Sequence, residues 1–366
     1  MTRALLLACC ALLLAGCETL SYYGKGVSGQ LRFYNARVPI AEVLQRDNLS
    51  EDVRRRLELV PAIRRFARHE LKLPVDGQYR DYVQLENASA AWSVFAAPEL
   101  SLKPYRWCYL FGSLCMEYRG YFRLRDAQRY EGKLRAQGYD THIGDVAAFS
   151  SLGLLDDPVT SVLVSYPDDL LALVLFHELA HVALYVKDDT AFNESFAEAL
   201  GEEGLRRWRL ARGEGAASVA VQRWRAQQAL VTEIALATRG QLAAVYASAD
   251  DDALKRARKR EILAAAGSAY AARCAASADT ADCSFARWFD AGLNNARLNA
   301  VATYQHWVPA FTALIRAGDV DGRPGDLRQF VRTVRELARL PRRERDAILQ
   351  ALSRTATKPA GEETAP

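Results

Sequence analysis

The sequence has little excess charge, few histidines and, beyond its first residues, no long apolar run. Its 48 Lys and Arg against 44 Asp and Glu leave a net charge of +4 on 366 residues. No basic cluster is interleaved with aromatic residues, so we expect no nucleic-acid partner. No segment after residue 17 holds a run of apolar residues long enough to cross a bilayer, which argues against a spanning helix in the mature protein. No repeat is evident, and half of the residues are apolar, which suffices for a globular core.

The first residues predict an export signal (1–16) that is not part of the fold. "MTRALLLACCALLLAGC" joins a basic residue to a short apolar run and small residues before Cys17. The ending "LAGC" resembles a bacterial lipobox, which implies cleavage before Cys17 and lipid on that cysteine. An ordinary signal peptide cut nearby is the alternative. Residues 17–30 are then expected to form the lipid anchor and a tether. The residue after the anchor cysteine is Glu18 and not Asp, which favours the periplasmic face of the outer membrane as the location.

The cysteines divide by position. Cys9 and Cys10 leave with the signal, and Cys17 carries the lipid. In an oxidising compartment the remaining four predict two short disulfides, although sequence alone does not fix their connectivity. A structural zinc site is the weaker alternative, because neither spacing is of the C-x-x-C type. The expected local pairs are Cys108 with Cys115 and Cys274 with Cys283.

The order of predicted elements indicates a mainly helical α+β fold. Residues 31–165 read as an α+β region, with Ser50 capping a helix that Pro61 should kink or divide. Short strands are expected at "AAWSVFAAP", "YRGYF", "DTHIGDVAAFSS" and "TSVLVSY", with a helix ending at Gly138. Residues 166–354 read as helical, and the tail 355–366 as disordered. A small mixed sheet thus precedes a helical region.

The segment after Pro167 predicts a buried helix with three polar side chains. From Leu170 to Val186 nearly every residue is apolar except His177, Glu178 and His181. Burying such groups without partners costs on the order of 2–7 kcal/mol each. Residues four apart share a helical face, so both imidazoles can bind one ion, while Glu178 approaches a bound water without being a ligand.

A second helix follows after "YVKDDT", where Asp189 or Thr190 is the expected N-cap. Two helices joined by a short turn pack antiparallel, so Glu194 and Glu198 can return toward the histidines. Glu194 then completes three protein ligands of a catalytic zinc site. Glu198, one turn further, is suited to accept the outer N–H of a ligating histidine.

"HELAH" followed by "NESFAEA" resembles the gluzincin zinc peptidases. The resemblance implies that His177, His181 and Glu194 bind zinc, that Glu178 is the general base and that Glu198 is the acidic residue behind a ligand. The chain more closely resembles a family of predicted bacterial aminopeptidase lipoproteins, on "GQL", "YRGYF", "AFSSLGLLDDP", "KDDTAFNESFAE" and "NNARLNAVATYQHWVPAF". It implies a zincin-like fold and a peptide substrate.

Several residues have competing interpretations. Glu194 and Glu198 could be a solvated helix face, and the histidines could be satisfied core residues. Tyr304 is the candidate for stabilising the oxyanion, with His306 as its rival and a structural tyrosine as the alternative. Residues 107–122 could offer an edge strand to a peptide, or be a core strand stapled by a disulfide. Glu117 in "CMEY" is a poor match to the glutamate that holds a substrate amino group.

The sequence therefore predicts a zinc-dependent peptidase, anchored to the cell envelope and acting as an aminopeptidase. The alternatives are an endopeptidase acting on envelope proteins, or a binding or scaffold lipoprotein whose metal site is structural or vestigial. Other divalent metals remain open. The basic amphipathic helix near the C-terminus favours packing on the core over lying on a membrane. The oligomeric state is not indicated.

Overall fold

The computed structural model describes residues 2–109, 114–148, 151, 153–215, 217–276, 283, 285–319 and 325–356, with the backbone alone for 2–18, 114, 302–305 and 356. Within them, the strands are β1 (Val38–Pro39), β2 (Asp81–Val83), β3 (Ala91–Pro98), β4 (Trp107–Tyr109), β5 (Leu114–Met116), β6 (Arg119–Tyr121), β7 (Tyr139–Val146) and β8 (Val159–Thr160). The N-terminal helices are α1 (Thr2–Asn35), α2 (Ile40–Val43), α3 (Glu51–His69), α4 (Leu124–Ala136) and α5 (Ser161–Val164).

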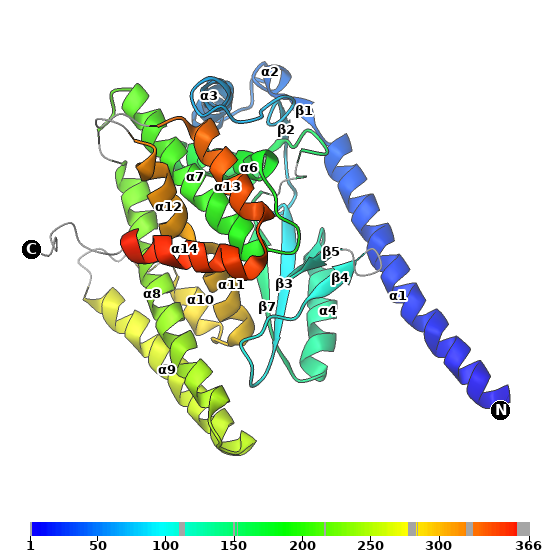
Figure 1. Cartoon of the computed structure of the whole chain (residues 1–366). Helices are drawn as coiled ribbons and strands as arrows, with labels where there is room; N and C mark the ends of the chain where they lie inside the picture. The colour runs from blue at the N-terminus through cyan, green and yellow to red at the C-terminus, as the bar shows by residue number, and fades with distance from the viewer. Residues whose placement is uncertain are drawn as a thin grey trace, which may run out of the picture.

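The remaining helices follow Pro167 and hold most of the helical residues (Figure 1). They are α6 (Asp168–Ala183), α7 (Thr190–Ala211), α8 (Val219–Ala247), α9 (Asp252–Ala275), α10 (Ala286–Asp290), α11 (Asn295–Gln305), α12 (Val308–Ala317), α13 (Leu327–Arg339) and α14 (Arg342–Ala356). The mainly helical α+β prediction is confirmed. No helix among the described residues is long and apolar enough to cross a membrane.

The strands of the described residues form three small sheets in the N-terminal half of the fold. In the largest, β3 is central and pairs antiparallel with β6 on one side and β7 on the other. A second sheet has the order β1-β2-β8, and β4 and β5 form a hairpin. Figure 1 shows α4 and α11 on different sides of β3 and β7. Trp92, Val94 and Ala96 pack against α4 and leave the alternate residues of β3 on the opposite face.

The main core gathers the buried sides of α3, α6, α7, α12 and α13. Helix α3 starts at the predicted cap, where the Ser50 hydroxyl accepts a hydrogen bond from the Val53 N–H at 3.4 Å. It runs on past Pro61 without being divided, because Leu57, Val60 and Ile63 on both sides of the proline are buried in this core. Proline has no N–H to donate within the helix, and the packing of α3 in the core outweighs the loss of that hydrogen bond.

Two local predictions were wrong. In "TSVLVSY" only Thr160 is in a strand, at the end of β8. The chain then turns into α5, because the Thr160 hydroxyl caps the new helix through the Leu163 N–H at 3.3 Å. The segment expected as a glycine-rich tether belongs to α1. Its glycines disfavour a helix by about 1 kcal/mol each, but this part of α1 is docked on the body of the protein. The ion pair of Lys25 with Asp126, at 2.6 Å, is one of the contacts that hold it.

Candidate metal centre

Helix α6 presents the two histidines and Glu178 from a buried, apolar setting. It begins after Pro167, and its first turn carries Asp168 and Asp169, which suit the positive end of the helix. Leu171, Leu175 and the other core-facing residues of the helix are shielded from solvent. Polar groups on such a helix must find partners inside the protein.

The turn after α6 is held by two side chains of the "DDTAFNES" segment. The Asp189 carboxylate caps α7 by accepting the Phe192 N–H at 3.2 Å, as predicted for this position. The Asn193 side chain accepts the Val186 N–H and donates to the Val186 carbonyl oxygen, both at 2.7 Å. These bonds fix the direction in which α7 returns along α6.

Gly201 lets the two helices come close beside His177. A Cβ on Gly201 would lie 3.2 Å from the Leu173 carbonyl oxygen and 3.3 Å from the Cβ of His177, which is tighter than ordinary contact. Glycine therefore removes the atom that would separate the helices at this level. Glu194 and Glu198, on preceding turns of α7, consequently reach the histidines.

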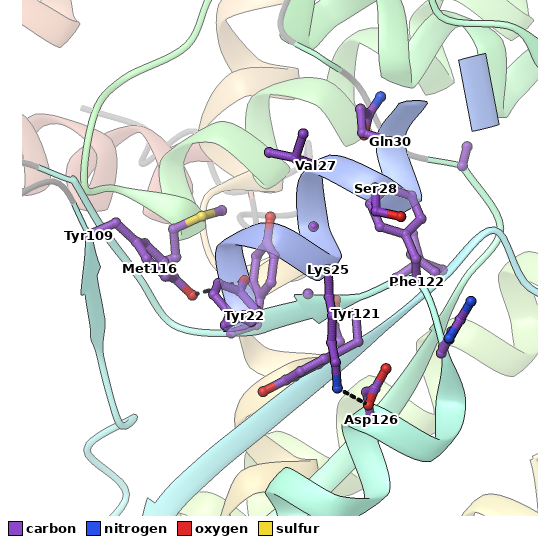
Figure 2. A pocket seen from close by; sticks show the side chains of 18 of the residues that line it. Tyr22, Lys25, Val27, Ser28, Gln30, Tyr109, Met116, Tyr121, Phe122 and Asp126 are labelled. Carbon is purple, nitrogen blue, oxygen red and sulfur yellow. Dashed lines mark hydrogen bonds and ion pairs between the residues drawn. The ribbon is translucent and has the colours of Figure 1, made fainter. Parts of the chain in front are cut away.

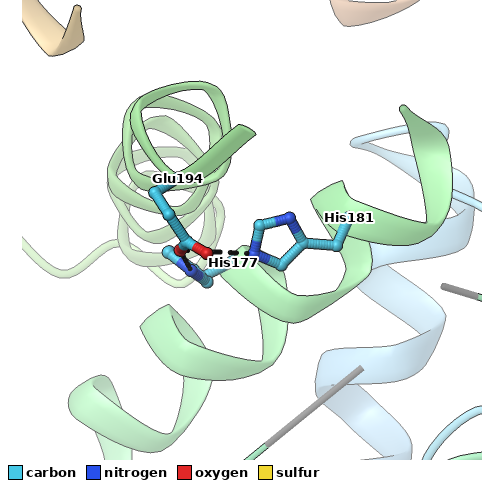
Figure 3. Close-up of side chains that lie close together, drawn as sticks. All are labelled: His177, His181 and Glu194. Atoms are coloured by element: carbon cyan, nitrogen blue, oxygen red, sulfur yellow. Dashed lines mark ion pairs between the residues drawn. The ribbon is translucent and has the colours of Figure 1, made fainter. Parts of the chain in front are cut away.

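The structure brings the three predicted ligands together (Figure 3). Glu194 Oε2 lies 3.4 Å from His177 Nε2 and 3.6 Å from His181 Nε2. One ligand atom from each residue lies within 4.8 Å of the other two, so this triad could hold a metal ion. Ligand atoms about 2.0–2.2 Å from a tetrahedral zinc are themselves roughly 3.3–3.6 Å apart. The donor set and the two separations therefore fit such an ion.

Hydrogen bonding decides the charge of the triad. Burial opposes charge on His177, but the carboxylates of Glu194 and Glu198 outweigh it and raise the pKa of that imidazole well above its usual value. Burial likewise works against the Glu194 carboxylate, yet hydrogen bonds from both histidines lower its pKa to about 2. A divalent cation would replace these protons as the partner of Glu194.

Glu198 lies behind the first histidine. Its Oε2 is 3.4 Å from His177 Nδ1, on the other side of the ring from Glu194. His177 is thus held from both sides. The Nδ1 of His181 is buried and has no hydrogen-bond partner among the described residues.

Glu178 lies beside the triad without belonging to it. Burial raises the pKa of its carboxyl, and the charges of His177 and His181 act in the opposite direction. The side chain lines the same cavity as the three candidate ligands. The arrangement therefore places one carboxyl group that is not a candidate ligand beside the potential metal position.

The triad opens into a cavity of about 740 Å³. Its walls come from α6 and α7, from the face of the β6-β3-β7 sheet turned away from α4, and from residues 22–32 of α1. Figure 2 shows Val27 and Lys25 of α1 above this space and the ion pair of Lys25 with Asp126 at its edge. The lining is mainly apolar and aromatic, as in many ligand sites.

Two tyrosines that the sequence reasoning did not single out line the cavity beside the triad. They are Tyr118, which precedes β6, and Tyr185, just after α6. Burial raises the pKa of Tyr118, and the negative charges of Glu194 and Glu178 raise it further, so its hydroxyl stays protonated at neutral pH. The alternation in "YRGYF" was the available signal, because it places Tyr118 and Gly120 on one face of a strand.

Other predicted site residues lie elsewhere. Tyr304 lies in α11, where only its backbone is described, so nothing places its side chain relative to the cavity. His306, its rival, is exposed and is not among the lining residues of the cavity. Glu117 is also absent from that lining. Burial raises the pKa of its carboxyl, and the charges of Arg106 and Arg342 act in the opposite direction.

Both predicted disulfides are present. Cys108–Cys115 closes the β4–β5 hairpin, and Cys274–Cys283 joins the end of α9 to the residues before α10. The first of them braces the hairpin from which Tyr109 and Met116 reach the cavity. The side chain of Cys17 lies outside the described residues.

Residues 21–349 match a protein-family model described as "Putative aminopeptidase". The match spans both helices of the candidate metal centre and the sheet beside them, and the chain belongs to this family. No curated protein and no solved structure matches the chain. The family description suggests peptidase activity.

Proposed function

We propose that this protein is a zinc-dependent peptidase, and an aminopeptidase as its family description suggests. The observation that carries the proposal is the His177–His181–Glu194 cluster, whose ligand atoms lie within 4.8 Å of one another at the wall of a large cavity. Three protein ligands leave a coordination position open, which is the arrangement of catalytic rather than structural zinc. A zincin-like fold belongs to the same proposal.

Each polar residue of the centre then has a role. When bound, zinc would polarise the scissile carbonyl and acidify a water molecule. Glu178 takes a proton from the attacking water and delivers it to the leaving amine. Glu198 accepts the Nδ1–H of His177 and so keeps Nε2 directed at the metal position.

A single substitution separates these roles. Glu178→Gln should retain zinc, measured by elemental analysis, yet lose peptide hydrolysis by at least about 100-fold. His181→Ala should lose both, which serves as the matched control for metal loss. Substantial hydrolysis by Glu178→Gln would overturn the assignment, whereas bound zinc with no cleavage by the unmodified protein would indicate a binding lipoprotein.

A hydroxyl donor beside the metal position would stabilise the oxyanion. Tyr304 was the prediction from sequence, and Tyr118 is the residue that the geometry supports, since it lines the same cavity as Glu178 and Glu194. No hydrogen-bond partner of the Tyr118 hydroxyl is found among the described residues, so it is free to donate to a substrate oxygen.

An endopeptidase is the second candidate, because of the charges in the cavity. The carboxylates of its lining are Glu178, Glu194 and Asp126, and Asp126 already pairs with Lys25. None of these is a spare acidic group to hold a substrate amino group. Matched peptides with free and acetylated N-termini decide the question: an aminopeptidase cleaves only the free form, and comparable cleavage of both would favour the endopeptidase.

We also propose that Cys17 carries lipid and holds the protein at the periplasmic face of the outer membrane. The support is the "LAGC" segment together with the apolar run before it. Palmitate labelling of the wild-type chain and its loss in Cys17→Ala would test this. Equal labelling of both would refute it.

A further inference from the structure

One face of the β6-β3-β7 sheet carries a row of very small residues inside the cavity. Ser93 in the central strand is paired with Gly120 of β6 and with Gly144 of β7. We call these three residues the glycine trough. Ser93 and Gly120 line the cavity directly, and Gly144 continues the row beneath the ring of Phe95, which lies 3.3 Å from the position of its missing Cβ.

Larger side chains bound the glycine trough on both sides. On one side Phe95 lies between Tyr118 and His142, with ring centroids 5.8 and 6.0 Å from its own. On the other side Ala91 pairs with Val146, and Phe122 also lines the cavity there. A groove one residue row wide, flanked by aromatic rings, is therefore built into the sheet.

The space above Gly120 is open. A Cβ at this position would meet no atom within 4 Å. Val27 and Tyr22 of α1 lie across the cavity, and Tyr22 is held there by Arg119, whose guanidinium carbon is 3.9 Å from the ring centroid. Side chains of α1 thus face the sheet across the cavity, while Gly120 itself is exposed and accessible. An apolar group that enters the groove would leave water where it contacts the sheet and α1.

The groove also adjoins the candidate metal centre. Tyr118, which is part of its wall, lines the same cavity as Glu178 and Glu194. A side chain in the groove would therefore belong to a residue close to the scissile bond.

We propose that the glycine trough is a specificity subsite that accepts one large apolar or aromatic side chain of the peptide substrate. The inference rests on the proposed peptidase function and names its substrate class. Burial of such a side chain favours binding because it removes apolar surface from water, and the small residues of the trough leave room for it.

Gly120→Val tests the proposal by filling the groove. Gly120 does not have a positive φ, and valine is well suited to a strand, so the variant should fold. We expect the ratio of kcat/KM for Phe-containing over Ala-containing peptides to fall at least about tenfold. Gly132→Val on α4, where a Cβ also meets nothing within 4 Å and which lies outside the cavity, should leave the ratio unchanged.

A binding measurement on the metal-free full chain separates this proposal from the proposed function. N-phenyl-1-naphthylamine should bind the wild type and Gly132→Val, be displaced by L-phenylalaninamide better than by L-alaninamide, and bind Gly120→Val at least about tenfold more weakly. This pattern of dye binding, found together with no peptide cleavage by any variant, would support the glycine trough as a binding subsite and refute the proposed peptidase function. Unchanged dye binding and an unchanged Phe/Ala ratio in an active Gly120→Val would overturn the trough and leave the peptidase standing.

Discussion

The carboxylate behind the first histidine offers the sharpest test of the metal centre. Glu198 Oε2 lies 3.4 Å from His177 Nδ1, while His177 Nε2 lies 3.4 Å from Glu194. The two ring nitrogens thus have separate acidic partners. Glu198→Gln changes only the group behind the ring and leaves the three proposed ligands in place.

The structure sets the size of the effect. Glu198 is partly buried, with 16% of its side chain exposed, and the imidazole it holds is 12% exposed. A hydrogen bond to a charged group is worth about 1.5–3 kcal/mol, which corresponds to a factor of roughly 10 to 100 in affinity. Outer partners of metal-ligating histidines have a similar effect, about 10- to 100-fold.

Zinc affinity of the purified chain is measured by competition with a chromophoric chelator at constant pH. Glu202→Gln is the matched control, because Glu202 lies one turn further along α7 and pairs with Arg225 instead of a histidine. We expect Glu198→Gln to weaken zinc binding by the stated factor and Glu202→Gln to leave it within about twofold. Equal affinities in the wild type and Glu198→Gln would refute the reasoning, as would an equal loss in the control.

Three further predictions follow from named contacts. Tyr118→Phe should lower kcat about 100-fold with little change in KM, measured by steady-state kinetics; full turnover would return the oxyanion role to Tyr304. Asp189→Ala should destabilise by about 3–5 kcal/mol, measured by urea unfolding, because Arg345 would stay buried and, among the described residues, keep only its longer ion pair with Asp346, at 3.7 Å. Asp189→Asn keeps the helix cap and should cost about 1 kcal/mol less. Burial, and then the charge of Arg297, lower the pKa of His142 to about 3 in the native state. Between pH 6.5 and 3 the unfolded chain therefore binds a proton at His142 that the native state does not bind. The free energy of unfolding should fall by up to about 1.4 kcal/mol per pH unit over that range as the pH decreases. His142→Phe should flatten that part of the stability profile, and an unchanged slope would contradict it.

The helical hairpin could be predicted because its signals are local. Four-residue spacings place His177 with His181 and Glu194 with Glu198, and Asp189 marks the start of the second helix. The short turn leaves little freedom in how the helices return. The distances of 3.4 and 3.6 Å are the geometric consequence of that pattern.

The cavity could not be predicted in the same way, because its walls are long-range. The register that sets Ser93 opposite Gly120 depends on strand pairing across the β4–β5 hairpin, and its pairing with Gly144 also spans α4, which no local pattern specifies. The strand expected at "TSVLVSY" failed for a related reason. Its β-branched residues favour a strand, but the Thr160 hydroxyl offers a helix cap to the Leu163 N–H.

The N-terminal helix changes how the proposed anchor relates to the site. The sequence predicted an anchor and a tether at residues 17–30, yet Tyr22 and several later residues of α1 line the cavity. Gly29 shows that this docking is close, because a Cβ there would lie 2.4 Å from the Phe122 ring, so glycine here is a packing requirement more than a sign of flexibility. If lipid is attached at Cys17, only a few residues separate the bilayer from a wall of the cavity that holds the candidate metal centre. Substrates would then be cleaved close to the membrane surface, and changes in α1 would alter both anchoring and access.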